Sequence, residues 1–371
     1  MKFSFSSEQE EFRTNLRRLF AERSPTKEVR RLMETEAGYD REAWRKLNAE
    51  LGLTAIRIPE AYGGQGFGFG ELCIVLEEMG RALVCAPCFS TAVLATGAIL
   101  NAGKEAEKQA LLPGIASGDT IATLAWVEDN GRWDAAGTAL VATRSGDGYT
   151  LDGHKSFVLD GHTADLIVVL ARTAKGLSLF TVAGEAAGLS RRALKTMDWT
   201  RKLARLEFKS VAANLLGDEG GAAGPFARTM IEAAICLANE MAGVAERLRE
   251  DALAYAKLRV QFGRAIASFQ SMKHKQADML VDVELAKSAA YYAAAALDEG
   301  DNDVDAVASL AKAQASESCL QTAIHAIQIH GGIGFTWDND THLWFKRAKS
   351  SEVFLGDPNW HREQMLLHWK V

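Results

Sequence analysis

The feature that most constrains the fold is a set of long, alanine-rich stretches without proline in the C-terminal part of the chain. The first, FARTMIEAAICLANEMAGVAERLREDALAYAKLR (226–259), runs for more than thirty residues without a proline. Two others, at 268–300 and 305–330, have the same character. Alanine favours helix and lets neighbouring helices approach closely. Residues 218–371 are therefore predicted to form a C-terminal four-helix bundle.

The two preceding parts of the chain have different patterns. Residues 1–118 hold four of the six prolines and contain helical stretches joined by glycine-rich segments such as IPEAYGGQGFGFGE, which predicts an N-terminal helical domain. Residues 119–217 contain short β-rich runs such as YTLDGHKSFVLDG and ADLIVVLAR, with turn signals between them, which predicts a central antiparallel β domain. The predicted fold class is α+β, mainly helical.

Composition excludes several classes of function. The formal net charge is −6, from 42 basic and 48 acidic residues, so there is no basic excess to attract nucleic acid. No apolar run reaches the length of about 18 residues that a membrane span needs, and the first residues are too charged for a signal peptide. Cys85 and Cys88 form a single CxxC without a second pair, so we expect no metal. The expected location is the cytoplasm.

Two stretches carry a more specific signal. They are RVQFGRAIASFQSMKHKQADM (259–279) and QIHGGIGFTWDNDTHLWFKRAK (328–349). Together with the helix–β–helix order, they resemble the acyl-CoA dehydrogenase family of flavoproteins, and the resemblance covers essentially the whole chain. It implies FAD as cofactor and the α,β-dehydrogenation of an acyl-CoA thioester. It also implies an electron-transfer flavoprotein or similar electron acceptor.

In this family FAD lies extended across a subunit interface. One subunit holds the flavin ring, and its neighbour holds the pyrophosphate and adenosine half. The resemblance assigns this second role to Arg259, Phe262, Gly263, Gln270, Gln328, Gly331 and Gly332. Arginine offers a planar fork to a diphosphate, and glycine lets backbone N–H groups approach an anion. Either motif alone could be an ordinary helix end, but the two in order favour a cofactor site. His274 and His330 are expected to pack or to form hydrogen bonds rather than to bind metal.

The residue expected to remove the substrate α-proton is absent. The family needs a carboxylate with a raised pKa there, and many members carry a Glu immediately before a Gly, a short helix after the second motif. In this chain that position is Leu355, followed by Gly356. Glu352 and Asp357 lie nearby, and we expect both to be surface or local hydrogen-bonding residues. No catalytic residue is therefore assigned.

Other family members carry the base on the long helix before the first motif. Counting back from Arg259 places that position at Ala233. Glu232 is adjacent, but one residue along a helix is a rotation of about 100°. Glu240 returns to roughly the same face two turns further on. Both are weak candidates for a displaced base.

The β domain departs from the family pattern on the flavin side. The family usually has Thr before Glu at the start of this domain, and here Val127 precedes Glu128. A Gly-Ser-Asp turn that helps to hold the acyl-CoA is replaced by NGRWDAAG. A second hydroxyl, in an aromatic-x-Thr turn, is replaced by Leu159. Both hydroxyls would have formed hydrogen bonds with the edge of the isoalloxazine ring.

The losses therefore fall on residues for the chain's own flavin ring and substrate, while residues reaching a neighbour's FAD are present. This predicts a subunit that completes the FAD site of a homologous catalytic subunit, as in α2β2 family members that include enzymes of steroid side-chain breakdown. Two alternatives stay open. One is a self-oligomeric dehydrogenase with a displaced carboxylate, for which Glu240 is the best choice. The other is a flavin-free acyl-CoA-binding or structural protein on the same scaffold.

Overall fold

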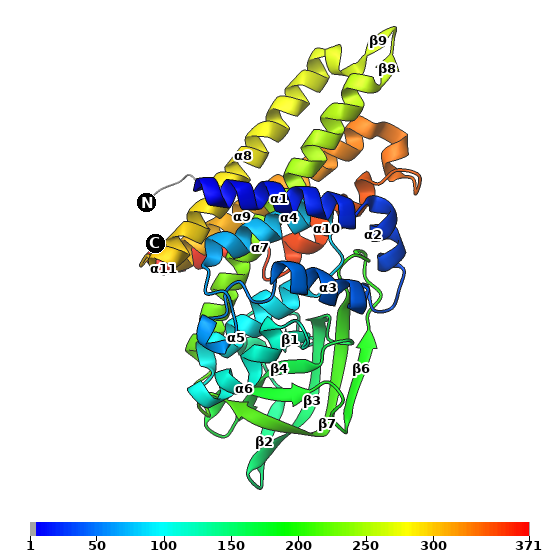
Figure 1. Cartoon of the computed structure of the whole chain (residues 1–371). Helices are drawn as coiled ribbons and strands as arrows, with labels where there is room; N and C mark the ends of the chain where they lie inside the picture. Colours follow the sequence, from blue (N-terminus) through cyan, green and yellow to red (C-terminus); the bar gives the residue numbers. More distant parts are fainter. Residues whose placement is uncertain (1–4, 371) are drawn as a thin grey trace. The chain divides into compact units, whose positions relative to one another are not determined.

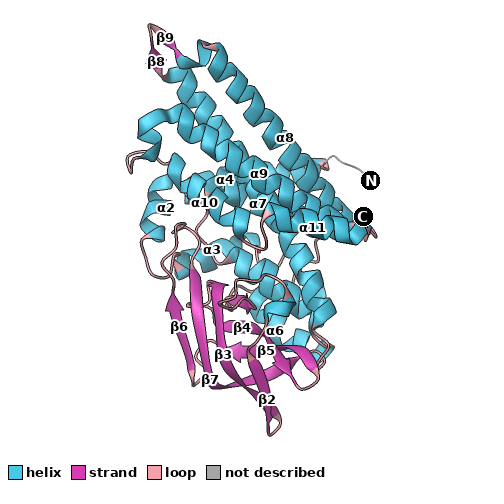
Figure 2. Cartoon of the chain, turned by 180° about the vertical axis from the view of Figure 1, so that it is seen from behind, coloured by secondary structure: helices cyan, strands magenta, loops and turns pink. Residues whose placement is uncertain are grey.

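The computed structural model describes residues 5–370. Helices come first along the chain, strands follow, and long helices complete it, which confirms the predicted fold class (Figures 1 and 2). The chain forms two compact units. One is built from the residues up to Arg30, from Phe69–Val84 and from Ala234 onward, and the other from Arg31–Gly68 and Cys85–Ala233.

The first unit is helical. Its helices are α1 (Ser7–Arg23), α4 (Phe69–Ala82), most of α7 (Ala223–Leu258), α8 (Gln270–Glu299), α9 (Val304–His330), α10 (Thr341–Val353) and α11 (Pro358–Trp369), and α2 (Thr26–Met33) begins in it. The three alanine-rich stretches form α7, α8 and α9. Within residues 5–370, no helix combines the length and the apolar character needed to cross a membrane.

Side-chain caps and glycines explain how the helices of this unit begin and pack. Ser6 caps α1 by accepting from the Gln9 backbone N–H, and the Gln9 side chain bonds back to the Ser6 N–H. Helices α4 and α7 approach so closely that only glycine fits at two positions. A Cβ at Gly80 would lie 2.3 Å from the Glu240 carbonyl oxygen, and one at Gly243 would lie 1.9 Å from the Glu77 carbonyl oxygen.

The second unit contains the strands and several shorter helices. The helices are α3 (Arg41–Leu51), α5 (Thr96–Ala102) and α6 (Glu105–Ala116), with a π-helical segment at Phe89–Ala95. The strands are β1 (Ala122–Ala125), β2 (Val141–Ser145), β3 (Gly148–Leu159), β4 (Leu166–Thr173), β5 (Gly176–Ala183), β6 (Leu189–Ala193) and β7 (Leu203–Leu216).

These seven strands form one sheet that is mainly, but not wholly, antiparallel. The antiparallel pairs β2–β3, β3–β7, β7–β5 and β5–β4 are joined by a β4–β2 contact, so the hydrogen-bonded pairs close into a ring. Strand β4 pairs in parallel with both β1 and β2, which the sequence did not predict. A parallel pair needs a long crossover, and the segment containing β2 and β3 provides it between β1 and β4.

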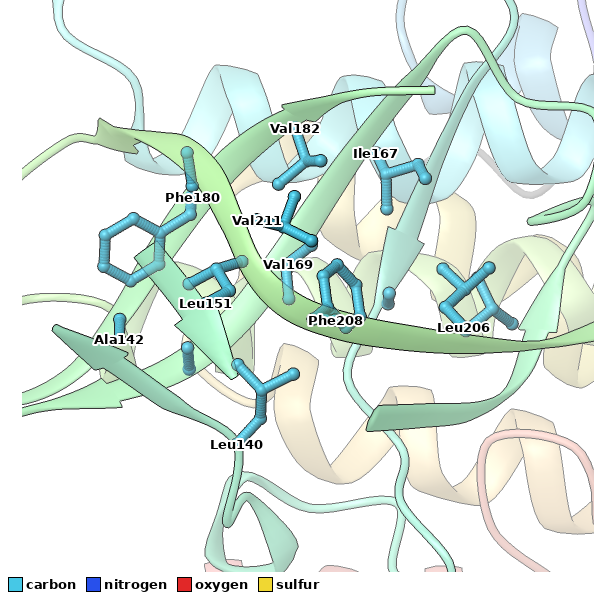
Figure 3. Close-up of a cluster of buried hydrophobic side chains, with 14 of the residues drawn as sticks. Leu140, Ala142, Leu151, Ile167, Val169, Phe180, Val182, Leu206, Phe208 and Val211 are labelled. Atoms are coloured by element: carbon cyan, nitrogen blue, oxygen red, sulfur yellow. The ribbon is translucent and has the colours of Figure 1, made fainter. Parts of the chain in front are cut away.

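Apolar side chains of the strands pack together inside the ring of paired strands. Leu151, Phe180, Leu206, Phe208 and Val211 are among the buried residues of one cluster (Figure 3). Full burial of each such side chain contributes about 1.5–3 kcal/mol. The sheet is therefore a packed scaffold for the loops at its ends.

Candidate cofactor-binding site

The first motif folds into a short hairpin between α7 and α8. Strands β8 (Val260–Gln261) and β9 (Arg264–Ala265) pair antiparallel, and the turn between them is Phe262–Gly263 (Figure 1). Phe262 has φ 53° and Gly263 has φ 75°. A two-residue hairpin turn with left-handed backbone at both positions matches the twist of the strands. The turn leaves the Phe262 ring 92% exposed, so a residue type that usually packs is presented at the surface.

The predicted diphosphate-binding side chains of this motif lie at the base of the hairpin. Arg259 follows the last residue of α7 and is exposed, and its backbone N–H donates to the Tyr255 carbonyl at 2.8 Å. Gln270 is the first residue of α8 and is also exposed. The N-cap of α8, Phe269, forms no side-chain cap, and the first turn contains no acidic residue. Backbone N–H groups at this helix start are suited to bind an anion.

The second motif ends helix α9. Gln328 is exposed in its last turn, and Gly331 ends the helix with φ 66° and ψ −147°, a conformation that only glycine adopts readily. A Cβ at Gly331 or at Gly332 would meet no atom within 4 Å. The Gly331 N–H donates to the Ile327 and Gln328 carbonyls of the last turn of α9. The space beside the two glycines is open, so a ligand could approach their backbone without meeting a side chain.

The fold brings the two motifs together. Tyr255, four residues before Arg259, stacks on His330, which directly precedes Gly331; their ring centroids are 4.4 Å apart. His330 Nδ1 lies 2.8 Å from the Ala326 carbonyl oxygen. The C-terminal ends of α7 and α9 are thus side by side. His330 packs between helices, whereas His274 is exposed on α8.

The position of the family's base is a rigid turn without a carboxylate. Leu355 is 5% exposed and has φ 63°, followed by Gly356 with φ 106°. The buried ammonium group of Lys312 donates to the carbonyl oxygens of Ser351 at 3.1 Å and Gly356 at 2.5 Å, and also to that of Glu352. His361 Nε2 donates to the Leu355 carbonyl at 3.1 Å. Burial and the charge of Lys312 lower the pKa of His361 to about 3, so this ring is neutral.

The carboxylates near Leu355 have local structural partners, as expected. Asp357 caps α11 by accepting from the Trp360 backbone N–H at 2.9 Å. Glu352 pairs with Lys349 one turn earlier on α10. Each carboxylate is therefore engaged in a local contact.

The two displaced candidates on α7 are engaged in buried ion pairs. Glu232 accepts from Arg57 at 3.2 Å and from Arg228 at 3.1 Å, and Ala233 beside it is fully buried. Glu240 accepts from Arg347 of α10 at 2.7 Å. Both carboxylates are therefore engaged by guanidinium groups.

In the β-containing unit, apolar groups occupy both positions where the family has flavin-facing hydroxyls. Val127 and Leu159 are 2% and 3% exposed. Glu128, which follows Val127, forms a buried ion pair with Lys155, which lies on the same strand as Leu159. Lys155 Nζ lies 2.8 Å from Glu128 Oε1. Burial lowers the pKa of Lys155 to about 8, and Glu128 accepts further hydrogen bonds from the Ala139 and Leu140 N–H groups. This ion pair anchors the loop that follows Glu128.

The loop that replaces the family's Gly-Ser-Asp turn is closed on itself. Trp126 donates from Nε1 to the Trp133 carbonyl at 3.0 Å, and the two indoles are 6.0 Å apart. Asn130 donates to the Gly137 carbonyl at 2.7 Å. Arg132 forms an ion pair with Asp134 at 2.7 Å. The polar groups of this loop are thus engaged with one another.

Comparison with known families covers these same segments. Models described as the N-terminal, middle and C-terminal domains of acyl-CoA dehydrogenase match residues 6–119, 123–211 and 226–368. This chain belongs to the acyl-CoA dehydrogenase family. The predicted family, the oxidoreductase class and the FAD cofactor are confirmed.

Three relatives of this acyl-CoA dehydrogenase family chain are informative. "Acyl-CoA dehydrogenase IpdE2" of Mycolicibacterium smegmatis is 34% identical over 97% of each chain. A chain in the structure of a Tcur3481-Tcur3483 steroid ACAD variant is 30% identical, with a TM-score of 0.88 over 98% of each chain. A chain of the ChsE4-ChsE5 complex from Mycobacterium tuberculosis is 28% identical, with a TM-score of 0.89 over 100% of this chain and 99% of that one.

The residues of the two motifs fit the diphosphate half of FAD. The structure shows an exposed Arg259 without an ion pair to any described carboxylate. It also shows the uncapped start of α8 and open space above Gly331 and Gly332. Cationic groups and free N–H groups are the donors that a diphosphate requires.

Sequence reasoning missed some residues that shape this site in the acyl-CoA dehydrogenase fold. Lys312 and His361 hold the Leu355 turn, yet Lys312 lies on α9, more than forty residues before Gly356. Arg264 stacks on Phe269 and was passed over although it follows Gly263 directly. In a hairpin with a two-residue turn at Phe262–Gly263, side chains alternate between the two faces of each strand. This alternation would have placed Arg264 on the same face as Arg259.

Proposed function

We propose that this chain is a subunit of a heteromeric acyl-CoA dehydrogenase, in which it completes the FAD site of a homologous catalytic subunit. The observation that carries the proposal is the contrast between two sets of positions. Leu355, Val127 and Leu159 are buried apolar residues at positions where catalytic family members have a base or hydroxyls. Arg259 is exposed, and so are Gly263, Gly331 and Gly332, where a Cβ would meet no atom within 4 Å.

In this arrangement the chain's residues bind and orient rather than transfer protons. Arg259 would hold the FAD diphosphate, the N–H groups at the start of α8 would donate to it, and Gly331 and Gly332 would leave room for its close approach. Gln270 and Gln328 would add amide donors and acceptors, and Phe262 would pack in the subunit interface. FAD, when bound, supplies the acceptor for the hydride that leaves the acyl-CoA β-carbon. The catalytic subunit would supply the base.

The comparisons support the partner and the substrate class. One relative's structure is a complex of two named proteins, ChsE4 and ChsE5, and another is described as a steroid ACAD with two protein names. We infer an α2β2-type assembly whose substrate is a bulky, steroid-like acyl-CoA. Electrons would leave through an electron-transfer flavoprotein or similar acceptor, and the assembly would act in the cytoplasm. The self-oligomeric alternative is disfavoured because both Glu232 and Glu240 are paired with arginine.

Co-expression with a homologous acyl-CoA dehydrogenase from the same genome tests this proposal. The expected product is a yellow complex with about one FAD per heterodimer that oxidises an acyl-CoA. The isolated chain should be colourless or inactive. Full dehydrogenase activity of the isolated chain would refute the subunit role, and a stable but colourless complex would favour the flavin-free alternative.

A further inference from the structure

One face of the β8–β9 hairpin presents two arginines. Val260 pairs with Ala265 and Gln261 pairs with Arg264. The Ile266 N–H donates to the Arg259 carbonyl at 2.8 Å, which continues the pairing by one residue. Because side chains alternate between faces along each strand, Arg259 and Arg264 share a face. They are diagonal neighbours, a relationship that places residues about 7–8 Å apart.

Neither arginine of this face is neutralised by the chain itself. Both side chains are exposed, and no carboxylate among residues 5–370 forms an ion pair with either one. In contrast, Arg57, Arg228 and Arg347 all pair with glutamates. The shared face of the hairpin therefore carries two positive charges that are available to an external anion.

Arg264 is also oriented in advance. Its guanidinium carbon lies 4.0 Å from the centroid of the Phe269 ring, and Phe269 is in turn met edge-on by Phe262 at 6.1 Å. A guanidinium stacked on an aromatic ring keeps its in-plane N–H donors free for a second partner. Holding the side chain in place lowers the conformational entropy lost when an anion binds.

The start of α8 adds a third positive element next to Phe269. The helix contains 30 residues, its N-cap provides no side-chain acceptor, and its first turn lacks acidic residues. The positive end of the helix dipole and the free N–H groups therefore lie beside the ring that orients Arg264. Two exposed guanidinium groups and a helix start match an anion with two adjacent charges, such as a diphosphate.

We propose that Arg264, positioned by Phe269, is a second arginine that binds the same FAD diphosphate as Arg259. The identity of the diphosphate rests on the proposed function of the chain as a cofactor-completing subunit. The charge balance is simple, since each guanidinium neutralises one of the two phosphate groups. Phe269 acts through Arg264 and is a positioning residue.

The test measures FAD affinity of the deflavinated complex by quenching of flavin fluorescence, with inorganic pyrophosphate as competitor. Arg264→Gln is expected to weaken FAD binding by roughly tenfold to a hundredfold, the range for a charge-assisted hydrogen bond. It should also weaken competition by pyrophosphate. Arg264→Lys should fall between Arg264→Gln and the unmodified complex. Arg18→Gln, which removes an exposed cation on α1, serves as the control and should leave FAD affinity unchanged.

The positioning role of Phe269 has a separate readout. Phe269→Leu should weaken FAD binding less than Arg264→Gln, and the double variant should be no weaker than Arg264→Gln alone, because both changes act through one contact. Unchanged FAD affinity in Arg264→Gln, with a clear loss in Arg259→Ala, would overturn this inference and leave the proposed function intact. Unchanged affinity in both variants would overturn the cofactor-completing function itself.

Discussion

The buried ion pair between α7 and α10 yields a prediction that separates structure from catalysis. Glu240 and Arg347 lie 2.7 Å apart, and their side chains are 5% and 6% exposed. Glu240→Gln would leave the Arg347 charge buried beside a neutral amide. Removing one partner of a buried pair typically costs about 3–5 kcal/mol. A loss of 1 kcal/mol in unfolding free energy lowers the melting temperature of a large domain by about 2 °C or more. The melting temperature should therefore fall by roughly 6–10 °C.

Thermal unfolding of four variants, followed by circular dichroism, measures this effect. Glu240→Gln and Arg347→Met should each lower the melting temperature, and the double variant should lose less than the sum because both changes remove the same interaction. The control is Glu317→Gln, which removes an ion pair with Arg362 whose side chains are 45% and 50% exposed. Such a pair contributes about 0–1 kcal/mol, so the control should unfold near the unmodified temperature.

Dehydrogenase activity of the complex provides the decisive second readout. If Glu240 has only a structural role, the complex that carries Glu240→Gln should oxidise acyl-CoA at an essentially normal rate at temperatures where it is folded. A melting temperature that is unchanged, combined with abolished turnover, would identify Glu240 as an active-site base. That result would refute the structural role and favour the self-oligomeric alternative.

Three further changes have defined outcomes. Gly243→Ala should destabilise the chain by about 1–3 kcal/mol in denaturant unfolding, because its Cβ would lie 1.9 Å from the Glu77 carbonyl oxygen. Gly224→Ala on the same helix meets no atom within 4 Å and should be neutral or slightly stabilising. The folded-state pKa of His361, about 3, is below its ordinary value of 6.5, so the unfolded chain takes up the proton first and stability is lost as pH falls from 6.5 toward 3. His361→Gln should flatten this part of the stability–pH profile, and an unchanged slope would show that another group is responsible. Leu355→Glu should produce no acyl-CoA oxidation by the isolated chain, measured with an artificial electron acceptor, because the flavin-side hydroxyls are still missing.

The long helices could be predicted from the sequence because the composition of a helix is read from consecutive residues. The alanine-rich, proline-free stretches correspond to α7, α8 and α9. The parallel pairs of β4 with β1 and β2 could not be read from strand patterns. Each pairing joins residues about thirty to forty positions apart, and alternation along a strand does not identify its neighbour.

The candidate site shows the same division. Gly263 gives a local signal for the hairpin turn, because a left-handed backbone favours glycine. Phe262 gives none, because a bulky residue rarely adopts its φ of 53°. The stacking of Tyr255 on His330, which unites the two motifs, joins residues from the ends of two different helices. No local pattern predicts that contact. The pairing of Glu240 with Arg347 is equally remote along the chain, which explains why Glu240 remained a candidate base until the structure supplied its partner.

The turn at Leu355 is held by hydrogen bonds although Leu355 has a left-handed backbone. A left-handed conformation is unfavourable for a residue other than glycine, and its cost is of the order of 1–3 kcal/mol. The carbonyl groups around this turn accept hydrogen bonds from Lys312 and His361, which hold the backbone in place. A neutral His361 and a buried ammonium bound to carbonyl oxygens make a stable, non-reactive setting. The backbone of this turn is therefore well held around the apolar Leu355 side chain, while Arg259 and Arg264 of the hairpin are exposed. A chain with these two properties can contribute binding and position to a reaction whose chemistry is carried out by another subunit.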